Sequence, residues 1–497
     1  MSKMMRSMFS SISALRAHQT RMDVIGDNIA NVNTVGFKSS RVTFASVFAS
    51  VLKSASAPDT ASGRGGSNPM QIGLGVSVAS VDMNMTRGSL QRTDNPTDLA
   101  IEGDGFFVVG GDGKAPRFTR AGNFSLDKMG NLVTATGLNV LGWMYDPENK
   151  QIDTTKSPSK INILAFPTLS PQATDQIILD GNLDSNKKIV EIQYDNDGNG
   201  KIDKDEKLTG EDVYNKIKDP SMSVLDKYQK ILNKIGDDMK SSISFRIFDS
   251  QGGEHTLSLT FVKYDSNKWF WIIDSPRKSD NYAKYLDDNI EGANTNFIAF
   301  GRIEFDSKGQ VINVQLEGAQ NQNSNKFTIK FKNNSLDEIT FDTSIGNTDE
   351  TLNIFKFDYI KQYSLGSSIR TKKISGYAAG SLQGFNVDAT GKIIGVYSNG
   401  LNQIIGQIAV ATFANPAGLQ RIGDNLYINT PNSGDPEIGI PGTGSRGTIF
   451  QGTLEMSNVD LAKEFTDMIV TQRGYQANAR VITASDELLQ DLVNIKR

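Results

Sequence analysis

Residues 457–497 read SNVDLAKEFTDMIVTQRGYQANARVITASDELLQDLVNIKR, and this stretch decides the fold. Its hydrophobic residues recur in alternating steps of four and three, a spacing typical of the narrow seam of a coiled coil. The seam consists of Leu461, Phe465, Met468, Gln472, Tyr475, Ala479, Ile482, Asp486, Leu489 and Val493. Because only Gln472 and Asp486 are polar, the sequence predicts one long helix that needs a partner along its length.

The partner that the sequence offers is the other end of the chain. Ser457 or Asn458 is suited to cap the C-terminal helix, and Gly474 is its one helix-weakening residue. At 1.5 Å per residue this helix would be roughly 50 Å long, too long to bury its seam in a compact domain. A similar stripe near the N-terminus consists of Met8, Ile12, Leu15, Met22, Ile25 and Ile29. We therefore expect the chain to go out from one terminal helix and return to the other.

Length and composition exclude several classes of protein. A chain of 497 residues is expected to form two to four domains. Its 52 basic and 56 acidic residues are well mixed, which argues against a nucleic-acid partner. The sequence has no apolar run long enough to span a membrane and no secretory signal at its start, and it contains no cysteine. Any stability outside the cell must therefore come from packing or assembly.

Four stretches carry a resemblance to a known family. They are DVIGDNIANVNTVGFK at 23–38, NPTDLAIEGDGFF at 95–107, SGYAAGSLQGF at 375–385 and GTLEMSNVDLAKEFTDMIVTQRGYQANARVI at 452–482. Together they resemble the rod and hook family of bacterial flagellar axial proteins, and they occur in that family's order. The resemblance covers roughly the first third and the last quarter of the chain.

The resemblance implies a structural subunit and not an enzyme. Its members polymerise into helical tubes, and the large central insertion favours a hook-type member over the alternative, a distal rod protein. A hook-type member would form a curved tube that acts as a universal joint between motor and filament. The implied partners are other copies of the chain and the distal rod, hook cap and hook-filament junction proteins. The implied location is extracellular.

The resemblance also implies export by the flagellar type III apparatus without a cleaved signal peptide. FASVF at 44–48 is similar to the short export-gate signal of hook-type substrates, an aromatic residue followed four positions later by another bulky apolar residue. Such a pattern is more often a site of local packing.

The predicted fold class is α+β, mostly antiparallel β, with a coiled-coil layer of terminal helices. The expected parts are terminal helices at 1–30 and 459–497, an extended linker at 31–72, a β-rich middle domain at 73–150 and 364–458, and an inserted outer β domain at 151–363. The residues expected to drive assembly are Ile12, Leu15, Ile25 and Ile29 against Phe465, Met468, Tyr475, Ile482 and Leu489. The alternative is that these seams form a helical hairpin within a monomer.

A short hairpin pattern recurs in the middle of the chain. An apolar residue, Asp, two residues and Gly occur around Asp127, Asp306 and Asp388, with a looser copy at Asp249. Asp accepts hydrogen bonds from the backbone ahead of it, while Gly adopts the left-handed conformation. The pattern therefore predicts antiparallel β structure.

Residues 195–206, DNDGNGKIDKDE, match the calcium-binding loop pattern at every position. The predicted oxygen ligands are Asp195, Asp197, Asn199, the Lys201 carbonyl, Asp203 and Glu206. The loop lies in a helical insert expected at about 187–240, between a strand-like stretch before it and a helix from about 209 to 218. Calcium is the one cofactor that the sequence indicates, and a lone loop of this kind would bind it with a Kd on the order of 10⁻⁴ to 10⁻³ M. The alternative is a solvated acidic turn.

Signs of enzymatic chemistry are sparse. The two histidines, His18 and His255, fall on an expected helix and an expected strand and are interpreted as structural or exposed. Gly442, Gly444 and Gly447 have a dinucleotide-type spacing, but the stretch that follows reads as a strand, so a helix N-terminus to hold a pyrophosphate is missing. The remaining alternatives from other classes are a monomeric secreted calcium-binding protein and a glycoside hydrolase, for which no carboxylate pair is marked.

Overall fold

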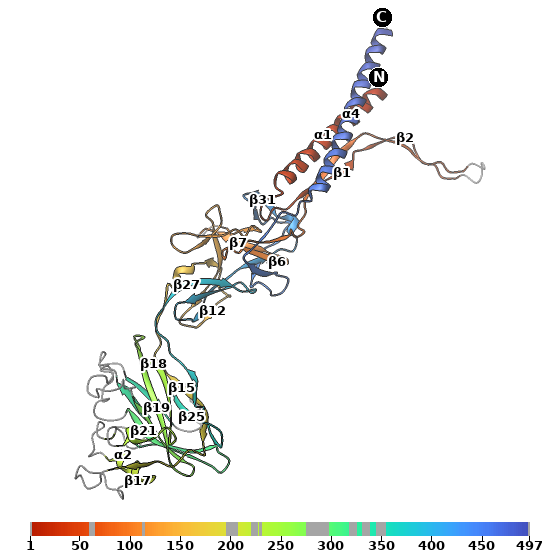
Figure 1. Ribbon diagram of the computed structural model, residues 1–497. Coiled ribbons are helices and arrows are strands. Elements are labelled where there is room, and N and C mark those ends of the chain that lie inside the picture. The colour runs from red at the N-terminus through yellow and green to blue at the C-terminus, as the bar shows by residue number, and fades with distance from the viewer. Residues whose placement is uncertain are drawn as a thin grey trace. The chain divides into compact units, whose positions relative to one another are not determined.

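Figure 1 shows the computed structural model of the chain, which describes residues 2–58, 65–111, 115–194, 207–219, 227, 231–274, 298–317, 326–330, 338–343 and 354–495. The chain forms two compact units. Unit 1 contains residues 1–167, 382–397 and 402–497, and unit 2 contains residues 168–381 and 398–401. The second unit is therefore an insertion into the first.

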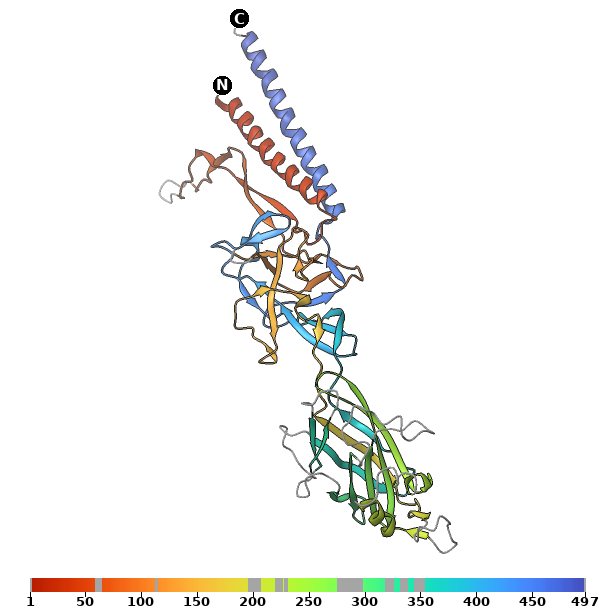
Figure 2. The ribbon, with the colours of Figure 1, turned by 90° about the vertical axis from the view of Figure 1, so that its left-hand side faces the viewer.

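The two ends of the chain form a pair of helices in unit 1, α1 (Ser2–Ala30) and α4 (Leu461–Ile495). They lie side by side in both ribbon views and run antiparallel (Figures 1 and 2). Asp460 caps α4, because its Oδ1 accepts hydrogen bonds from the amides of Ala462 and Lys463 at 3.0 and 3.3 Å. The prediction that Ser457 or Asn458 caps this helix is therefore wrong by two or three positions.

The segment expected to be an irregular linker, 31–72, contains strands. β1 (Ser40–Ser46) pairs antiparallel with β4 (Val76–Met83), and β2 (Ala49–Lys53) pairs antiparallel with β3 (Met70–Gly73). The linker prediction was based on the Ser, Ala and Gly content of the segment. It failed because short strands of modest hydrophobicity are stabilised by their pairing partners, which the composition of a segment does not reveal.

The middle of unit 1 is an antiparallel sheet with a hydrophobic cluster on each face. Its strands follow the order β27-β28-β29-β11-β7-β8-β32-β31. They are β27 (Gly380–Val387), β28 (Lys392–Tyr397), β29 (Asn402–Ile408), β11 (Asn139–Asp146), β7 (Phe106–Gly110), β8 (Arg117–Thr119), β32 (Leu426–Ile428) and β31 (Gln420–Gly423). Alternate residues of β7 enter opposite clusters: Phe107 and Val109 enter one, and Phe106 and Val108 the other. The sheet is therefore a buried central layer.

Smaller strands border this sheet and lead to the terminal helices. β34 (Thr448–Gln451) pairs with β6 (Leu99–Glu102), and β35 (Thr453–Glu455) pairs with β5 (Leu90–Arg92), both antiparallel. The others are β9 (Ser125–Leu126), β10 (Leu132–Val133), β12 (Gln151–Ile152), β13 (Ser159–Lys160), β30 (Val410–Thr412) and β33 (Glu437–Gly439).

The recurring aspartate pattern forms the predicted hairpin turns. At Asp127, Oδ1 accepts hydrogen bonds from the amides of Met129 and Asn131, both at 2.8 Å. Asp306, Asp388 and Asp249 accept the equivalent pairs of amides in their own turns. The following glycine has a positive φ in all four turns. The mostly antiparallel α+β fold class is thereby confirmed.

Unit 2 contains two five-stranded sheets that share one aromatic core. The first is an antiparallel meander of β18 (Lys240–Phe248), β19 (Glu254–Asp265), β20 (Lys268–Asp274), β21 (Ala299–Phe305) and β22 (Val311–Leu316). The second has the order β23 (Lys326–Lys330), β24 (Glu338–Asp342), β25 (Ile354–Tyr363), β15 (Gln176–Asp184) and β26 (Arg370–Ile374). In it β15 pairs parallel with β25. Trp269, Trp271 and Phe357 are fully buried between the sheets.

The bounds of unit 2 differ from the predicted outer domain at 151–363. β12 and β13 pair with β11, so residues 151–160 belong to the sheet of unit 1. β26 pairs with β15, so residues 370–374 belong to unit 2. Strand pairing therefore sets the boundary of unit 2. The prediction instead followed the points where the composition and residue pattern of the sequence change.

The helical insert of unit 2 contains β16 (Glu191–Gln193), β17 (Lys207–Thr209) and α2 (Glu211–Lys218). The predicted strand before the loop and the predicted helix after it are both present. The apolar spacing from Val224 to Ile235 also predicts a second amphipathic helix in the insert, and most of that stretch lies outside the described residues. The described end of that stretch contains a short 3₁₀ turn, Leu232–Lys234, flanked by buried Ile231 and Ile235.

Candidate functional site

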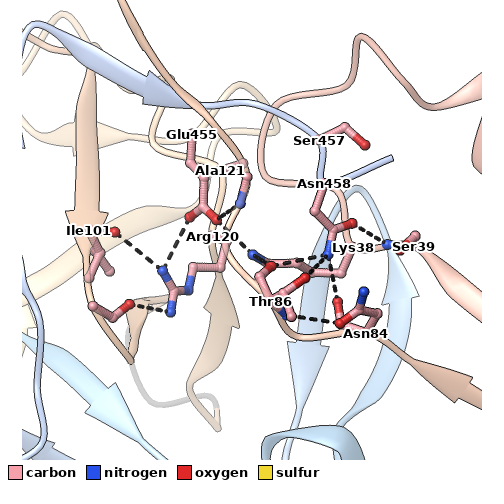
Figure 3. Close-up of polar contacts among 12 residues, drawn as sticks. Lys38, Ser39, Asn84, Thr86, Ile101, Arg120, Ala121, Glu455, Ser457 and Asn458 are labelled. Carbon is pink, nitrogen blue, oxygen red and sulfur yellow. Dashed lines mark hydrogen bonds and ion pairs between the residues drawn. The ribbon is translucent and has the colours of Figure 1, made fainter. Parts of the chain in front are cut away.

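Both terminal helices are joined to the middle sheet by a buried cluster of charges, which we call the junction. It consists of Lys38, Arg120 and Glu455 (Figure 3). Glu455 Oε1 accepts a hydrogen bond from Lys38 Nζ at 2.7 Å, and Oε2 accepts one from Arg120 Nη1 at 3.2 Å. The side chains of Glu455 and Lys38 are each 1% exposed, and that of Arg120 is 4% exposed. The junction therefore connects the segment after α1, the segment before α4 and the end of β8.

Backbone carbonyls accept further hydrogen bonds from the two cations. Arg120 donates from Nη2 to the Gly103 carbonyl at 2.8 Å and from Nη1 to the Ile101 carbonyl at 3.4 Å. Lys38 Nζ donates to the Thr86 carbonyl at 2.8 Å. Because one carboxylate faces two buried cations, these carbonyls supply further acceptors to the desolvated charges. Among the described residues, Arg120 Nε is buried without a hydrogen-bond partner.

The pKa directions reflect burial opposed by ion pairing. Burial lowers the pKa of Lys38, and the neighbouring Glu455 carboxylate offsets this effect in part. Burial also lowers the pKa of Arg120. For Glu455, burial alone would raise the pKa, but Arg120 and Lys38 outweigh it and hold the pKa below its usual range. Ionised Glu455 is therefore the group on which the junction depends.

Two glycines allow the chain to approach Glu455 closely. The Gly88 amide donates to Glu455 Oε1 at 3.0 Å, and the Gly36 amide donates to the Glu455 carbonyl at 2.8 Å. A Cβ at Gly88 would lie 1.8 Å from the Met456 carbonyl oxygen. Gly36 has φ +68°, and a Cβ there would lie 2.6 Å from the Ala121 nitrogen. Neither position accepts a side chain without movement of the backbone.

Asn458 joins three segments beside the junction (Figure 3). Its Oδ1 accepts a hydrogen bond from the Ser39 amide at 2.7 Å, and its Nδ2 donates to the carbonyls of Asn84 and Thr86 at 2.8 and 3.1 Å. Asn458 therefore fixes the chain just before α4 and does not serve as its cap.

The residues predicted to form the helix seam lie at unequal depths within one chain. Ile25 is buried, with 3% of its surface exposed. Ile12, Leu15, Ile29, Met468, Ile482 and Leu489 are partly buried. Phe465 and Tyr475 are 50% and 36% exposed. The expected seam is thus only partly covered by α1.

Small and polar residues of α4 occupy the contact with α1 instead. Thr471 and Ser485 are buried, at 0% and 7% exposure. A Cβ at Gly474 would lie 3.0 Å from the His18 ring. Arg21 Nη2 and Asp467 Oδ1 form an ion pair at 2.9 Å across the two helices. The single-chain contact therefore follows a face of small residues, which lets the helices approach closely and turns several large apolar side chains outward.

Other sequence signals have structural positions. Phe44 of the FASVF stretch lies in β1 against the His18 ring, with centroids 5.6 Å apart, whereas Phe48 is 84% exposed. His255 is buried, and its Nε2 lies 3.1 Å from Asp249 Oδ2. The glycine-rich stretch at 442–447 is followed by β34, in agreement with the rejection of a dinucleotide site.

The six predicted calcium ligands, Asp195, Asp197, Asn199, Lys201, Asp203 and Glu206, lie outside the described residues. Among the residues that are described, no group of three or more His, Asp or Glu side chains is arranged to hold a metal ion. No helix in the described ranges has the length and apolar character needed to cross a membrane.

The sequence pattern did not predict the junction. Glu455 is 417 positions from Lys38 and 335 from Arg120, and no periodicity connects them. The available signal was a charged residue inside each of two motifs: Lys38 ends DVIGDNIANVNTVGFK, and Glu455 lies in GTLEM. That Lys38 and Glu455 are buried could be known only from the folded chain.

Family profiles match four parts of the chain. They are described as Flagella basal body rod protein at residues 8–38, Flagellar hook protein FlgE/F/G D1 domain at 100–199, Flagellar basal body protein FlaE D2 domain at 225–377, and Flagellar basal body rod FlgEFG protein C-terminal at 451–495. These profiles include both terminal helices and the inserted unit.

Relatives match nearly the whole chain. It is 35% identical to Flagellar hook protein FlgE of Treponema pallidum over 99% of this chain and 100% of that protein. It is 34% identical to that of Borreliella burgdorferi over 99% and 100%, and 31% identical to that of Escherichia coli over 98% and 99%. Because the similarity to hook proteins extends over nearly the whole chain, the alternative that the chain is a distal rod protein is not favoured. The chain therefore belongs to the flagellar hook protein family and is a hook subunit.

Proposed function

We propose that the outward face of α4 joins neighbouring subunits into the hook tube. Members of this structural family assemble with copies of themselves and with other flagellar components. The observation that carries the proposal is the exposure of large apolar side chains along α4. Phe465 is 50% exposed, Ile469 and Val470 are each 57% exposed, and Leu488 is 51% exposed. Several large apolar side chains exposed on one helix are costly in water and are typical of a surface that another chain covers.

The geometry of the contact explains how such a surface would propagate. Because α4 uses its small-residue face for α1, its apolar face is left for a different partner. A contact between unlike surfaces of identical subunits forms a ring if its rotation closes and extends into a helical filament if it does not, and the filament is the arrangement proposed here. The polymer proposed here is a short curved tube that passes motor torque to the filament as a universal joint.

The experiment is electron microscopy and sedimentation of the full-length chain and of two variants. We expect the wild type to form curved tubes and the double variant Phe465→Ser/Ile469→Ser to remain monomeric. Met129→Ser is the matched control, because Met129 is 70% exposed but lies in a turn of unit 1 away from α4. Tubes of normal length from the double variant would refute the proposal.

The proposed partners beyond the polymer are the distal rod, hook cap and hook-filament junction proteins, at the ends of the tube. The proposed route is export through the flagellar type III apparatus without a cleaved signal peptide, which places the assembled protein outside the cell. Deleting residues 44–48 from the full-length chain and assaying secretion tests whether FASVF contributes to this route.

We also propose that the loop at 195–206 binds calcium and stabilises the insert of unit 2. Its support is the ligand pattern of the sequence together with the pairing of β16 and β17, in which Gln193 lies opposite Lys207. This antiparallel pairing holds the two ends of the loop near one another, as a closed ligand loop requires. A structural role would come from fixing these ends.

Calorimetric titration and thermal unfolding with calcium or with a chelator test the calcium proposal. We expect weak binding, with a Kd on the order of 10⁻⁴ to 10⁻³ M, that is lost in Asp195→Asn/Glu206→Gln. Asp212→Asn is the matched control, since Asp212 is exposed in the first turn of α2. Equal binding by the wild type and the double variant would show that the loop is an acidic turn.

A further inference from the structure

His18 lies at the contact between α1 and α4, with one face against the backbone of Gly474. A Cβ at Gly474 would lie 3.0 Å from two atoms of the His18 ring, so a glycine at this position is what lets the ring fit. On another side, the ring meets Phe44 edge to face at 5.6 Å. Within the described part of the chain, its buried Nδ1 has no hydrogen-bond partner.

The elements packed around His18 carry several charged groups that are already paired. On α1, Arg21 lies one turn from His18, and it is paired with Asp467 of α4 at 2.9 Å. On the strands packed against α1, Arg41 of β1 is paired with Asp82 of β4 at 3.8 Å. These two carboxylates are engaged with arginines, and a third, Glu464 of α4, is hydrogen-bonded to the Asn28 side chain of α1 and interacts with Arg21.

We propose that His18 is a pH-sensitive latch of the terminal helix pair, closed when its imidazole is neutral and released when the imidazole is protonated. A neutral imidazole leaves Nδ1 as an unpaired acceptor, which costs less than an unpaired charged donor in the same place. Protonation places an N–H donor and a positive charge in the same pocket, with no acceptor and with Arg21 nearby. His18 is only partly buried, so it is the buried Nδ1 edge of the ring that must move away from α4 for this N–H to reach water.

The closed helix pair favours the neutral form of the His18 imidazole, and this preference sets the direction of the pH dependence. Burial and then the charge of Arg21 lower the pKa of His18 from its ordinary value of 6.5. The separated helices therefore bind a proton at higher pH than the closed pair does. The helix pair is most stable above pH 6.5, and it becomes less stable as the pH falls through the lower pKa that His18 has in the closed pair.

This inference rests on the helix pair of one chain and goes beyond the proposed assembly. The experiment is amide hydrogen exchange of the full-length chain, soluble and sedimented, from pH 8 to pH 5, corrected for intrinsic exchange. In the wild type, protection of residues 2–30 and 461–495 should fall below pH 6.5, by at most about tenfold per pH unit, the limit for one proton. In His18→Gln, whose side chain does not ionise, that fall should disappear.

The matched control is His255→Gln, because His18 and His255 are the two histidines of the chain and His255 lies in unit 2. It should leave the pH dependence of the terminal helices unchanged. An undiminished fall in His18→Gln overturns the latch, and so does an absence of helix protection at pH 8 in both forms of the wild type. A His18-dependent loss in a chain that never sediments would support the latch while removing the proposed assembly.

Discussion

Replacing Glu455 with Gln tests the physical account of the junction. The substitution keeps the shape of the side chain but removes the charge that faces Lys38 at 2.7 Å and Arg120 at 3.2 Å. Both cations are almost completely buried, so neither reaches water in the folded chain. Removing one partner of a buried ion pair leaves an uncompensated charge and costs about 3–5 kcal/mol. The carbonyl acceptors reduce the free-energy cost of the substitution, but two cations lose their counter-charge at once. We therefore expect Glu455→Gln to lower the free energy of unfolding by an amount within that range.

Local amide exchange measures this loss directly. The amides of Gly36 and Gly88 both donate to Glu455, and they report on opening of the junction. A loss of about 3–5 kcal/mol corresponds to exchange faster by about two to four powers of ten. Amides of β19 in unit 2 should exchange at an unchanged rate, because they belong to the other compact unit.

The matched control is Glu102→Gln in the same unit. Glu102 lies 3.9 Å from Arg87, and the two side chains are 48% and 52% exposed. Such a pair contributes at most about 1 kcal/mol. If Glu455→Gln costs no more than Glu102→Gln, the buried ion pairs do not hold the junction, and the backbone carbonyls alone satisfy its cations.

Three further outcomes follow from the same geometry. Lys38→Met should lower the free energy of unfolding by about 1–3 kcal/mol, less than Glu455→Gln does, because Arg120 still compensates the carboxylate. A larger loss of stability, measured by urea unfolding, would contradict this. Gly88→Ala should open the junction, since its Cβ would lie 1.8 Å from the Met456 carbonyl oxygen, and unaltered exchange at residues 84–90 would argue against the strain. Because the folded pKa of Glu455 lies below its ordinary value of 4.5, the stability from this group is complete above pH 4.5 and is lost as the pH falls through the lower folded value. Urea unfolding between pH 7 and pH 3 should therefore show a steeper acid loss in the wild type than in Glu455→Gln, and equal slopes would exclude this role.

The helix pair shows where the pattern of the sequence was insufficient. The alternating spacing predicts a helix near 461–495, and α4 occupies those residues. The same pattern suggested that Phe465 and Tyr475 pack against α1, but they are 50% and 36% exposed. A seam shows that a helix has an apolar side, and it does not show which neighbour covers that side. In this chain the close approach at Gly474 and the Arg21–Asp467 ion pair fix the rotation of α4.

The sequence by itself determined the local structure and the family. The aspartate turns, the long terminal helix and the strand before the 195–206 loop arise from interactions between residues a few positions apart, and such interactions produce recognisable local sequence patterns. Only the tertiary structure decided the junction, the strands within 31–72 and the bounds of unit 2. Each of these depends on partners brought together from distant positions, and the burial that makes Glu455 so consequential exists only after those segments have met.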